Sequence, residues 1–89
     1  MAITIGLHND DLADLFVTVA DLNLAGTPVV VQAQRINEDQ TVQISVQEDG
    51  DGNGNIQWST QRTDDPSQTG QRTVEVANGD TIDVTTHFG

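Results

Sequence analysis

The sequence contains no cysteine, no lysine and no tyrosine, and only three aromatic residues. Without cysteine, neither a disulfide framework nor a thiolate metal site can form. The aromatic residues Phe16, Trp58 and Phe88 are too few for the platforms on which nucleic-acid bases usually stack. Stability must therefore come from the hydrophobic core, a partner chain or a bound ion, because a domain of 89 residues buries little surface.

Positive charge is also scarce, since three arginines stand against fourteen acidic residues and the formal net charge is −11. This charge repels nucleic-acid backbones and anionic membranes, so we expect no direct nucleic-acid partner and no membrane partner. The length allows one domain over residues 1–89 and excludes scaffolds of roughly 200 residues or more, such as barrels of eight strand–helix units.

The N-terminal stretch up to Phe16 has no basic residue and no long apolar run. We therefore expect neither a signal peptide nor a transmembrane segment. A protein that is cytoplasmic or associated with a virus particle is consistent with both expectations.

The chain's dominant pattern is a period of two. Apolar and polar residues alternate through residues 41–47 and again through residues 55–61, as half-buried strands require. The segment 48–54 between them is rich in glycine and aspartate, which are typical turn residues. Together these segments predict a hairpin with a longer loop.

A second hairpin is predicted around Asn78-Gly79. The strands near 72–77 and 80–86 alternate in the same way, and a two-residue Asn-Gly link suits the twist of paired strands.

Residues 10–22 fit two structures. The β-branched and aromatic run at 16–19 favours a strand near 14–21, as do the neighbouring strands. The alternative is a short helix, because five apolar side chains fall on one helical stripe: Leu12, Leu15, Phe16, Val19 and Leu22.

The fold class expected is therefore all-β, a small antiparallel β-sandwich or a partly open barrel of about seven strands. The expected strands lie near 2–7, 14–21, 28–36, 41–47, 55–62, 72–77 and 80–86. The expected core consists of the inward side chains Ile3, Ile5, Leu7, Leu15, Val17, Val19, Val29, Val31, Ala33, Val42, Ile44, Val46, Ile56, Trp58, Val74, Val76, Ile82 and Val84.

The segment from Asp49 to Ile56 resembles the first eight positions of a calcium loop of the EF-hand or dockerin kind. Its candidate metal ligands are Asp49, Asp51, Asn53 and Asn55. Three features depart from that motif: Thr60 stands where a bidentate glutamate is needed, the flanks are strands, and extra glycines add flexibility. The cofactor expectation is thus none, or Ca²⁺ at this loop, the alternative being an exposed loop that only keeps the protein soluble.

Acidic residues gather in the turns. If consecutive strands run antiparallel, successive loops alternate between the two ends of the domain. One end then collects six carboxylates from three loops: Asp10, Asp11, Glu38, Asp39, Asp64 and Asp65. The other end collects Asp21, Glu48, Asp49, Asp51 and Asp80. The first group could form a docking surface for a basic partner or a metal site, or the three turns could lie apart.

The outward residues of two expected strands carry no charge. They are Thr41, Gln43, Ser45 and Gln47, followed by Asn55, Gln57, Ser59 and Gln61. Most exposed sheets place charges there to prevent edge pairing. An uncharged polar face can instead bind a glycan or another subunit, so self-association is a reasonable expectation.

Catalytic patterns are absent from the sequence. There is no cysteine or lysine nucleophile, no serine with a paired histidine and acid, and no phosphate-binding glycine pattern. His8 and His87 could bind a metal with Asp10 or Asp83, although histidines near chain ends are usually solvated. We therefore expect that this protein is not an enzyme.

Three functions follow from these observations. The first is a non-catalytic protein-interaction or structural module, such as a subunit of a phage particle or surface array. The second is an acidic inhibitor that mimics nucleic acid on a basic enzyme, because carboxylates compete with phosphates for arginine and lysine. The third is a calcium-dependent carbohydrate-binding domain. The partner expected for these functions is another protein, a glycan or a second copy of this chain.

Overall fold

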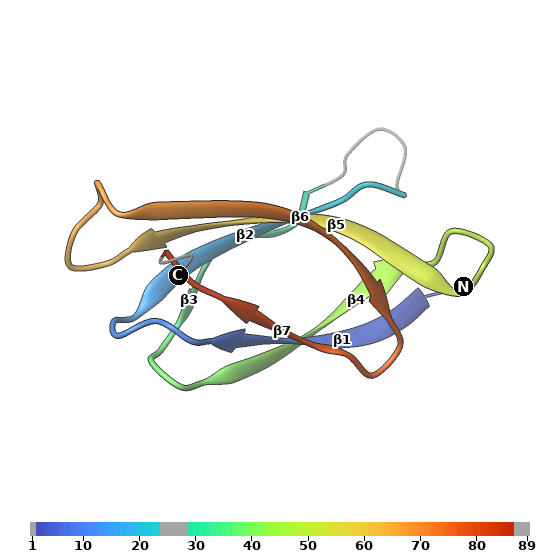
Figure 1. Cartoon of the computed structure of the whole chain (residues 1–89), viewed down its shortest axis with the longest axis horizontal. Coiled ribbons are helices and arrows are strands. Elements are labelled where there is room, and N and C mark those ends of the chain that lie inside the picture. The colour runs from blue at the N-terminus through green and yellow to red at the C-terminus, as the bar shows by residue number, and fades with distance from the viewer. Residues whose placement is uncertain (1, 24–28, 87–89) are drawn as a thin grey trace.

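The structure is a computed structural model that describes residues 2–23 and 29–86. This part of the chain contains seven strands and no helix (Figure 1). The strands are β1 (Ala2–Asn9), β2 (Leu15–Asp21), β3 (Val29–Ile36), β4 (Thr41–Gln47), β5 (Asn53–Arg62), β6 (Thr69–Ala77) and β7 (Thr81–Val84). The alternating pattern therefore located the strands, and the ambiguous segment at 10–22 contains strand β2 rather than a helix.

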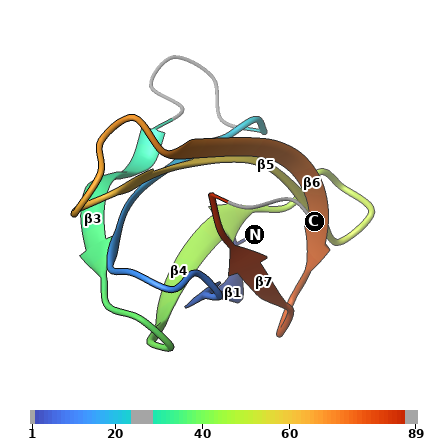
Figure 2. The ribbon, with the colours of Figure 1, turned by 60° about the vertical axis from the view of Figure 1, so that its left-hand side comes forward.

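The strands form two sheets, one ordered β4-β1-β7 and the other β3-β2-β5-β6. Figure 2 shows the four-stranded sheet curving over the three-stranded one. The expected all-β sandwich is thus confirmed. One pair departs from the antiparallel expectation, because β1 and β7 run parallel. In the described part of the chain, no helix has the length and apolar character that crossing a membrane requires.

Both predicted hairpins are wrong. β4 pairs with β1 while β5 pairs with β2 and β6, so residues 48–52 connect two layers. The Asn78-Gly79 turn likewise carries the chain from β6 in one sheet to β7 in the other. This turn docks on β1, where the Thr4 N–H donates to Asn78 Oδ1 at 2.9 Å and the Gly79 N–H donates to the Thr4 carbonyl at 2.8 Å. Local turn chemistry is the same in a hairpin and in such a corner, so the sequence could not separate them.

The hydrophobic core lies between the two sheets. Its buried members are Ile3, Ile5, Leu7, Leu15, Val17, Val19, Ile36, Val46, Ile56, Trp58, Val76 and Val84. Five more expected core residues are partly buried against it: Val31, Val42, Ile44, Val74 and Ile82.

Strand β3 is where the expected core is wrong. Val29 is 42% exposed and Ala33 is exposed, whereas Ile36, which was not expected inside, is fully buried. The cause is a pair of register shifts between β2 and β3, one of them near Ala33, whose φ is +47°. A one-residue slip turns every following side chain to the other face of the sheet.

Candidate functional site

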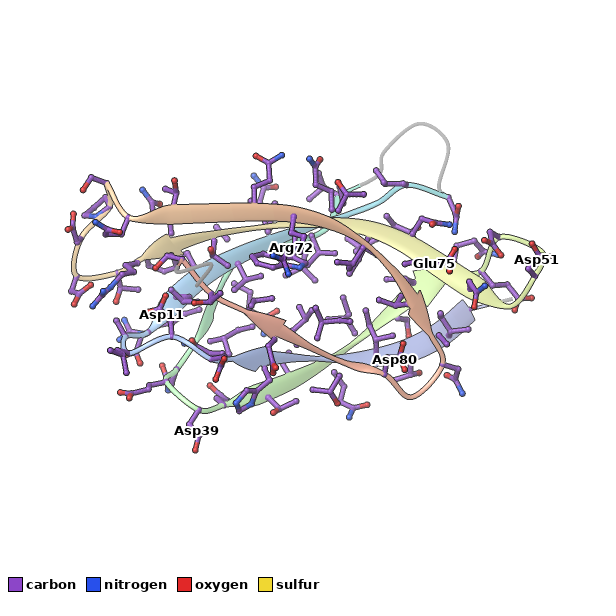
Figure 3. All side chains as sticks on the ribbon, in the orientation of Figure 1. Asp11, Asp39, Asp51, Arg72, Glu75 and Asp80 are labelled. Carbon is purple, nitrogen blue, oxygen red and sulfur yellow. The ribbon has the colours of Figure 1, made fainter. Side chains whose placement is uncertain are left out.

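Three loops lie together at one end of the sandwich, on the left in Figure 1. The Asp39 N–H donates to the Asn9 carbonyl at 3.2 Å, and the Thr63 N–H donates to the Asp14 carbonyl at 3.1 Å. The surface formed by these loops is called the acidic loop end: residues 10–14, 37–40 and 63–68. Figure 3 shows Asp11 and Asp39 at this end, and Asp51 and Asp80 at the opposite end. Chain direction alone was enough to predict this grouping.

Asp11 differs from the other acids in the predicted group because its side chain is fully buried. Its Oδ2 accepts hydrogen bonds from the backbone N–H and the hydroxyl of Thr86, at 2.8 and 2.5 Å. Its Oδ1 accepts from the Leu12 N–H at 2.7 Å and lies 4.0 Å from Arg62 Nη1. A carboxylate with these contacts holds the fold together and is not a surface ligand for a partner.

The Asn9 side chain holds the same loop in place through hydrogen bonds. The buried Asn9 side chain donates to the carbonyls of Ala13 and Ile36, both at 2.9 Å, and accepts from the Asp11 N–H at 2.8 Å. The loop that follows β1 is therefore tied to the end of β3 through side-chain hydrogen bonds of Asn9.

Asp14 joins two loops and was missing from the predicted site. Its Oδ1 accepts from the Glu38 N–H at 2.8 Å, and its Oδ2 accepts from Arg35 Nη2 at 2.6 Å. The Glu38 hydrogen bond, and next the Arg35 guanidinium, hold the pKa of Asp14 below its ordinary value of 3.8. The available signal was its place in the same acidic turn as Asp10 and Asp11.

The remaining five predicted acids are exposed at this end: Asp10, Glu38, Asp39, Asp64 and Asp65. The Asp39 side chain is 90% exposed and lies 3.3 Å from His8 Nε2. Asp64 accepts from Arg62 Nε at 3.0 Å. Asp65 accepts from the hydroxyl and N–H of Ser67, and these two bonds lower its pKa. Within residues 2–23 and 29–86, no three histidine, aspartate or glutamate side chains come close enough to hold a metal ion.

Leu12 is the most exposed large hydrophobic residue of the acidic loop end, at 80%. It follows Asp10 and Asp11 directly, and its own N–H is bound to the Asp11 carboxylate. Sequence reasoning missed it, because Leu12 also fitted the apolar stripe of a helix. The sequence signal that could have identified Leu12 is its place in a turn, between Asp11 and Asp14 and outside the alternating pattern of the strands.

The predicted calcium loop is closed by hydrogen bonds of its own. Asp49 Oδ1 accepts from the Asp51 N–H at 2.9 Å, and Asp49 Oδ2 accepts from the Asn55 amide at 3.3 Å. The Asp49 N–H donates to the Asn53 carbonyl at 2.7 Å. The Asp51 contact is the main reason why the pKa of Asp49 is lowered. Calcium at this loop stays an untested prediction.

Two other expected groupings change in the structure. The uncharged outward residues of 41–47 and 55–61 lie in different sheets, so they form two faces and not one. The His8 ring lies 3.0 Å from the Thr41 hydroxyl, while His87 falls outside the described residues.

Comparison with known proteins finds no match: no family model fits the chain, and no curated protein or solved structure is significantly similar to it. A β-sandwich by itself carries many unrelated functions, so function has to be inferred from the side chains of the acidic loop end.

Proposed function

We propose that this protein is a non-catalytic interaction module that docks on a basic surface of a partner protein through the acidic loop end. The observation that carries the proposal is Leu12, an 80% exposed leucine beside exposed carboxylates on a loop fixed by buried hydrogen bonds. A subunit of a larger assembly, such as a phage particle, is one setting for such a module.

Leu12 and the carboxylates have separate roles in this docking. Burial of the leucine side chain contributes on the order of 2 kcal/mol to binding, because apolar surface leaves water. The carboxylates of Asp10, Glu38 and Asp39 attract a basic partner and disfavour acidic ones. A loop that is already fixed by Asn9 and Asp11 loses little conformational freedom on binding, which favours affinity.

Three of the described acids have pKa values shifted in the direction that favours ion pairing over acid catalysis. A carboxylic acid that donates a proton near neutral pH needs a raised pKa, usually from an apolar pocket. Asp14, Asp49 and Asp65 instead have lowered pKa values, because backbone or hydroxyl groups donate hydrogen bonds to them. These groups remain charged at neutral pH, as ion pairing requires.

A nucleic-acid mimic is a special case of the same docking. Exposed carboxylates on three neighbouring loops present negative charge over one surface, as a phosphate backbone does. If the basic surface is a nucleic-acid site, duplex DNA competes with this protein for the partner. If the surface is not such a site, DNA has no effect on binding.

The proposal is tested by quantitative affinity capture from a lysate of cells that make the protein. Beads carry wild-type protein, Leu12→Ala, or Glu38→Gln/Asp39→Asn. A matched control, Asp51→Asn/Glu75→Gln, removes two charges from exposed positions toward the opposite end of the sandwich (Figure 3). We expect a basic protein to be retained by the wild type and the control, to be lost at least about tenfold from both other variants, and to be released in about 1 M salt. Equal retention on all four proteins contradicts the proposal.

A further inference from the structure

Strand β4 is an edge strand without the usual protection against pairing. The sheets end in β3, β6, β4 and β7. β3 is interrupted by register shifts and carries Arg35, β6 carries Arg72 and Glu75, and β7 is only four residues long and carries Asp83. β4, with the sequence Thr41–Gln47, has no charge, no proline and a regular register with β1. Such an edge is a template for another strand.

The last residue of β4, Gln47, shows which backbone groups of this strand point away from β1. The Gln47 N–H donates to Asp21 Oδ2 at 2.6 Å, and the Gln47 carbonyl accepts from the Asn23 amide at 3.0 Å, so these groups do not bond to β1. Alternate residues of an antiparallel strand turn their backbone groups to the same side. The N–H and carbonyl groups of Gln43 and Ser45 therefore point to the open edge, where the described residues offer them no hydrogen bond.

We propose that β4 pairs antiparallel with β4 of a second copy of this chain, with Ile44 opposite Ile44. The strand is nearly symmetric about this residue. Gln43 then faces Ser45 of the second copy on the outer face, and Val42 faces Val46 on the inner face. Neutral polar side chains meet neutral polar ones, and apolar side chains meet apolar ones.

This register joins two three-stranded sheets into one sheet of six strands, ordered β7-β1-β4-β4-β1-β7. Both apolar faces lie on the same side of it, because residues directly opposite share a face. Each Gln43–Ser45 pair exchanges two backbone hydrogen bonds. The pairing also covers Val42 and Ile44, which face the core but are only partly buried at this edge.

The contact is short, since Asp21 and Asn23 occupy the backbone groups of Gln47. It is smaller than a standard stable interface, so we expect a dissociation constant between about 10 µM and about 1 mM. Each copy carries a net charge of −11, and salt screens the repulsion between copies. Dimerisation should therefore strengthen with salt, whereas docking through the acidic loop end should weaken.

Sedimentation velocity from about 10 µM to about 1 mM tests the proposal, with Gln43→Pro as the decisive variant. Proline removes the outward N–H of Gln43 and keeps the bonds of β4 to β1, so an edge position tolerates it. We expect dimerisation in the wild type and in Gln43→Thr, which keeps the N–H, and at least about tenfold weaker dimerisation in Gln43→Pro. A monomer at the highest concentration, or equal dimerisation of folded Gln43→Pro, overturns the proposal.

Amide hydrogen exchange in the wild type provides a readout that needs no variant. Exchange at Gln43 and Ser45 should slow as concentration rises, because their N–H groups become hydrogen-bonded. Dimerisation without slower exchange at these two residues overturns the register. The Leu12→Ala variant should dimerise as the wild type does, because Leu12 is not part of β4. The docking proposal and the dimer proposal can therefore fail independently of each other.

Discussion

The carboxylate of Asp11 accepts a hydrogen bond from the backbone N–H of Thr86 at 2.8 Å, across 75 positions of sequence. This bond joins the loop after β1 to the segment that follows β7. The same carboxylate also accepts from the Leu12 N–H, so one buried acid closes the end of the sandwich and orients the exposed leucine. Fold stability and the proposed docking surface therefore both depend on this residue.

Asp11→Ala should lower the free energy of unfolding by about 2–4 kcal/mol, because it leaves the buried N–H and hydroxyl of Thr86 without their acceptor. Urea denaturation measures the change. The control is Asp10→Asn at the exposed neighbour, which should stay within about 0.5 kcal/mol of the wild type. Equal stability of the two variants would show that Asp11 does not hold this end together.

Gly54→Ala should destabilise the core by about 1–3 kcal/mol through overpacking. A Cβ at this position would lie 2.9 Å from Val46 Cγ2, 3.0 Å from Val76 Cγ2 and 3.2 Å from Ile3 Cδ1, so side chains of both sheets would have to move. Thermal melting should show a clear loss relative to Gln57→Ala, which shortens a side chain of the same strand. An unchanged melting temperature would mean that the two sheets pack more loosely here than the structure shows.

Asp14 should contribute a pH-dependent part of the stability. Because its pKa in the folded protein lies below the ordinary value of 3.8, its contribution is present above that value and lost as the pH falls through the lowered pKa. The wild type is compared with Asp14→Asn at each pH. Both proteins keep the other acids, so the change in repulsion among those acids with pH is similar in the two and largely cancels. We expect their difference in melting temperature to shrink below pH 3.8. A difference that stays constant or grows on acidification would contradict the assigned hydrogen bonds to Glu38 and Arg35.

Calcium should have no effect on the melting temperature relative to a chelator. The Asp49 loop already closes through bonds to Asp51, Asn53 and Asn55. An ion that bound the folded state would raise the melting temperature with concentration. If calcium does so in the wild type and not in Asp49→Asn, the loop is the metal site that its sequence resembles, and a calcium-dependent carbohydrate-binding function gains support.

The elements of the fold could be predicted from the sequence because a period of two is a local property of each strand. The pairing of strands could not, since the Asn78-Gly79 turn fits a hairpin and a corner between sheets equally well. The two register shifts in β3, which bury Ile36 and expose Val29, depend on contacts with β2. Local sequence does not contain those contacts.

The candidate site was predictable to a similar extent. Chain direction brings the acidic turns together, which the sequence reveals. The burial of Asp11 depends on Thr86, which is distant in sequence, and the exposure of Leu12 depends on where the core ends. Both are tertiary effects, and together they distinguish the buried, structural Asp11 from the exposed acids of the acidic loop end.

The claim that the acidic loop end presents Leu12 on a preformed loop is tested most directly by backbone ¹⁵N relaxation of the free protein. The contacts of Asn9 and Asp11 predict order parameters of about 0.85 at residues 10–13, as in the strands. Values below about 0.6 at these residues would mean that the loop is flexible, and would contradict a preformed docking surface.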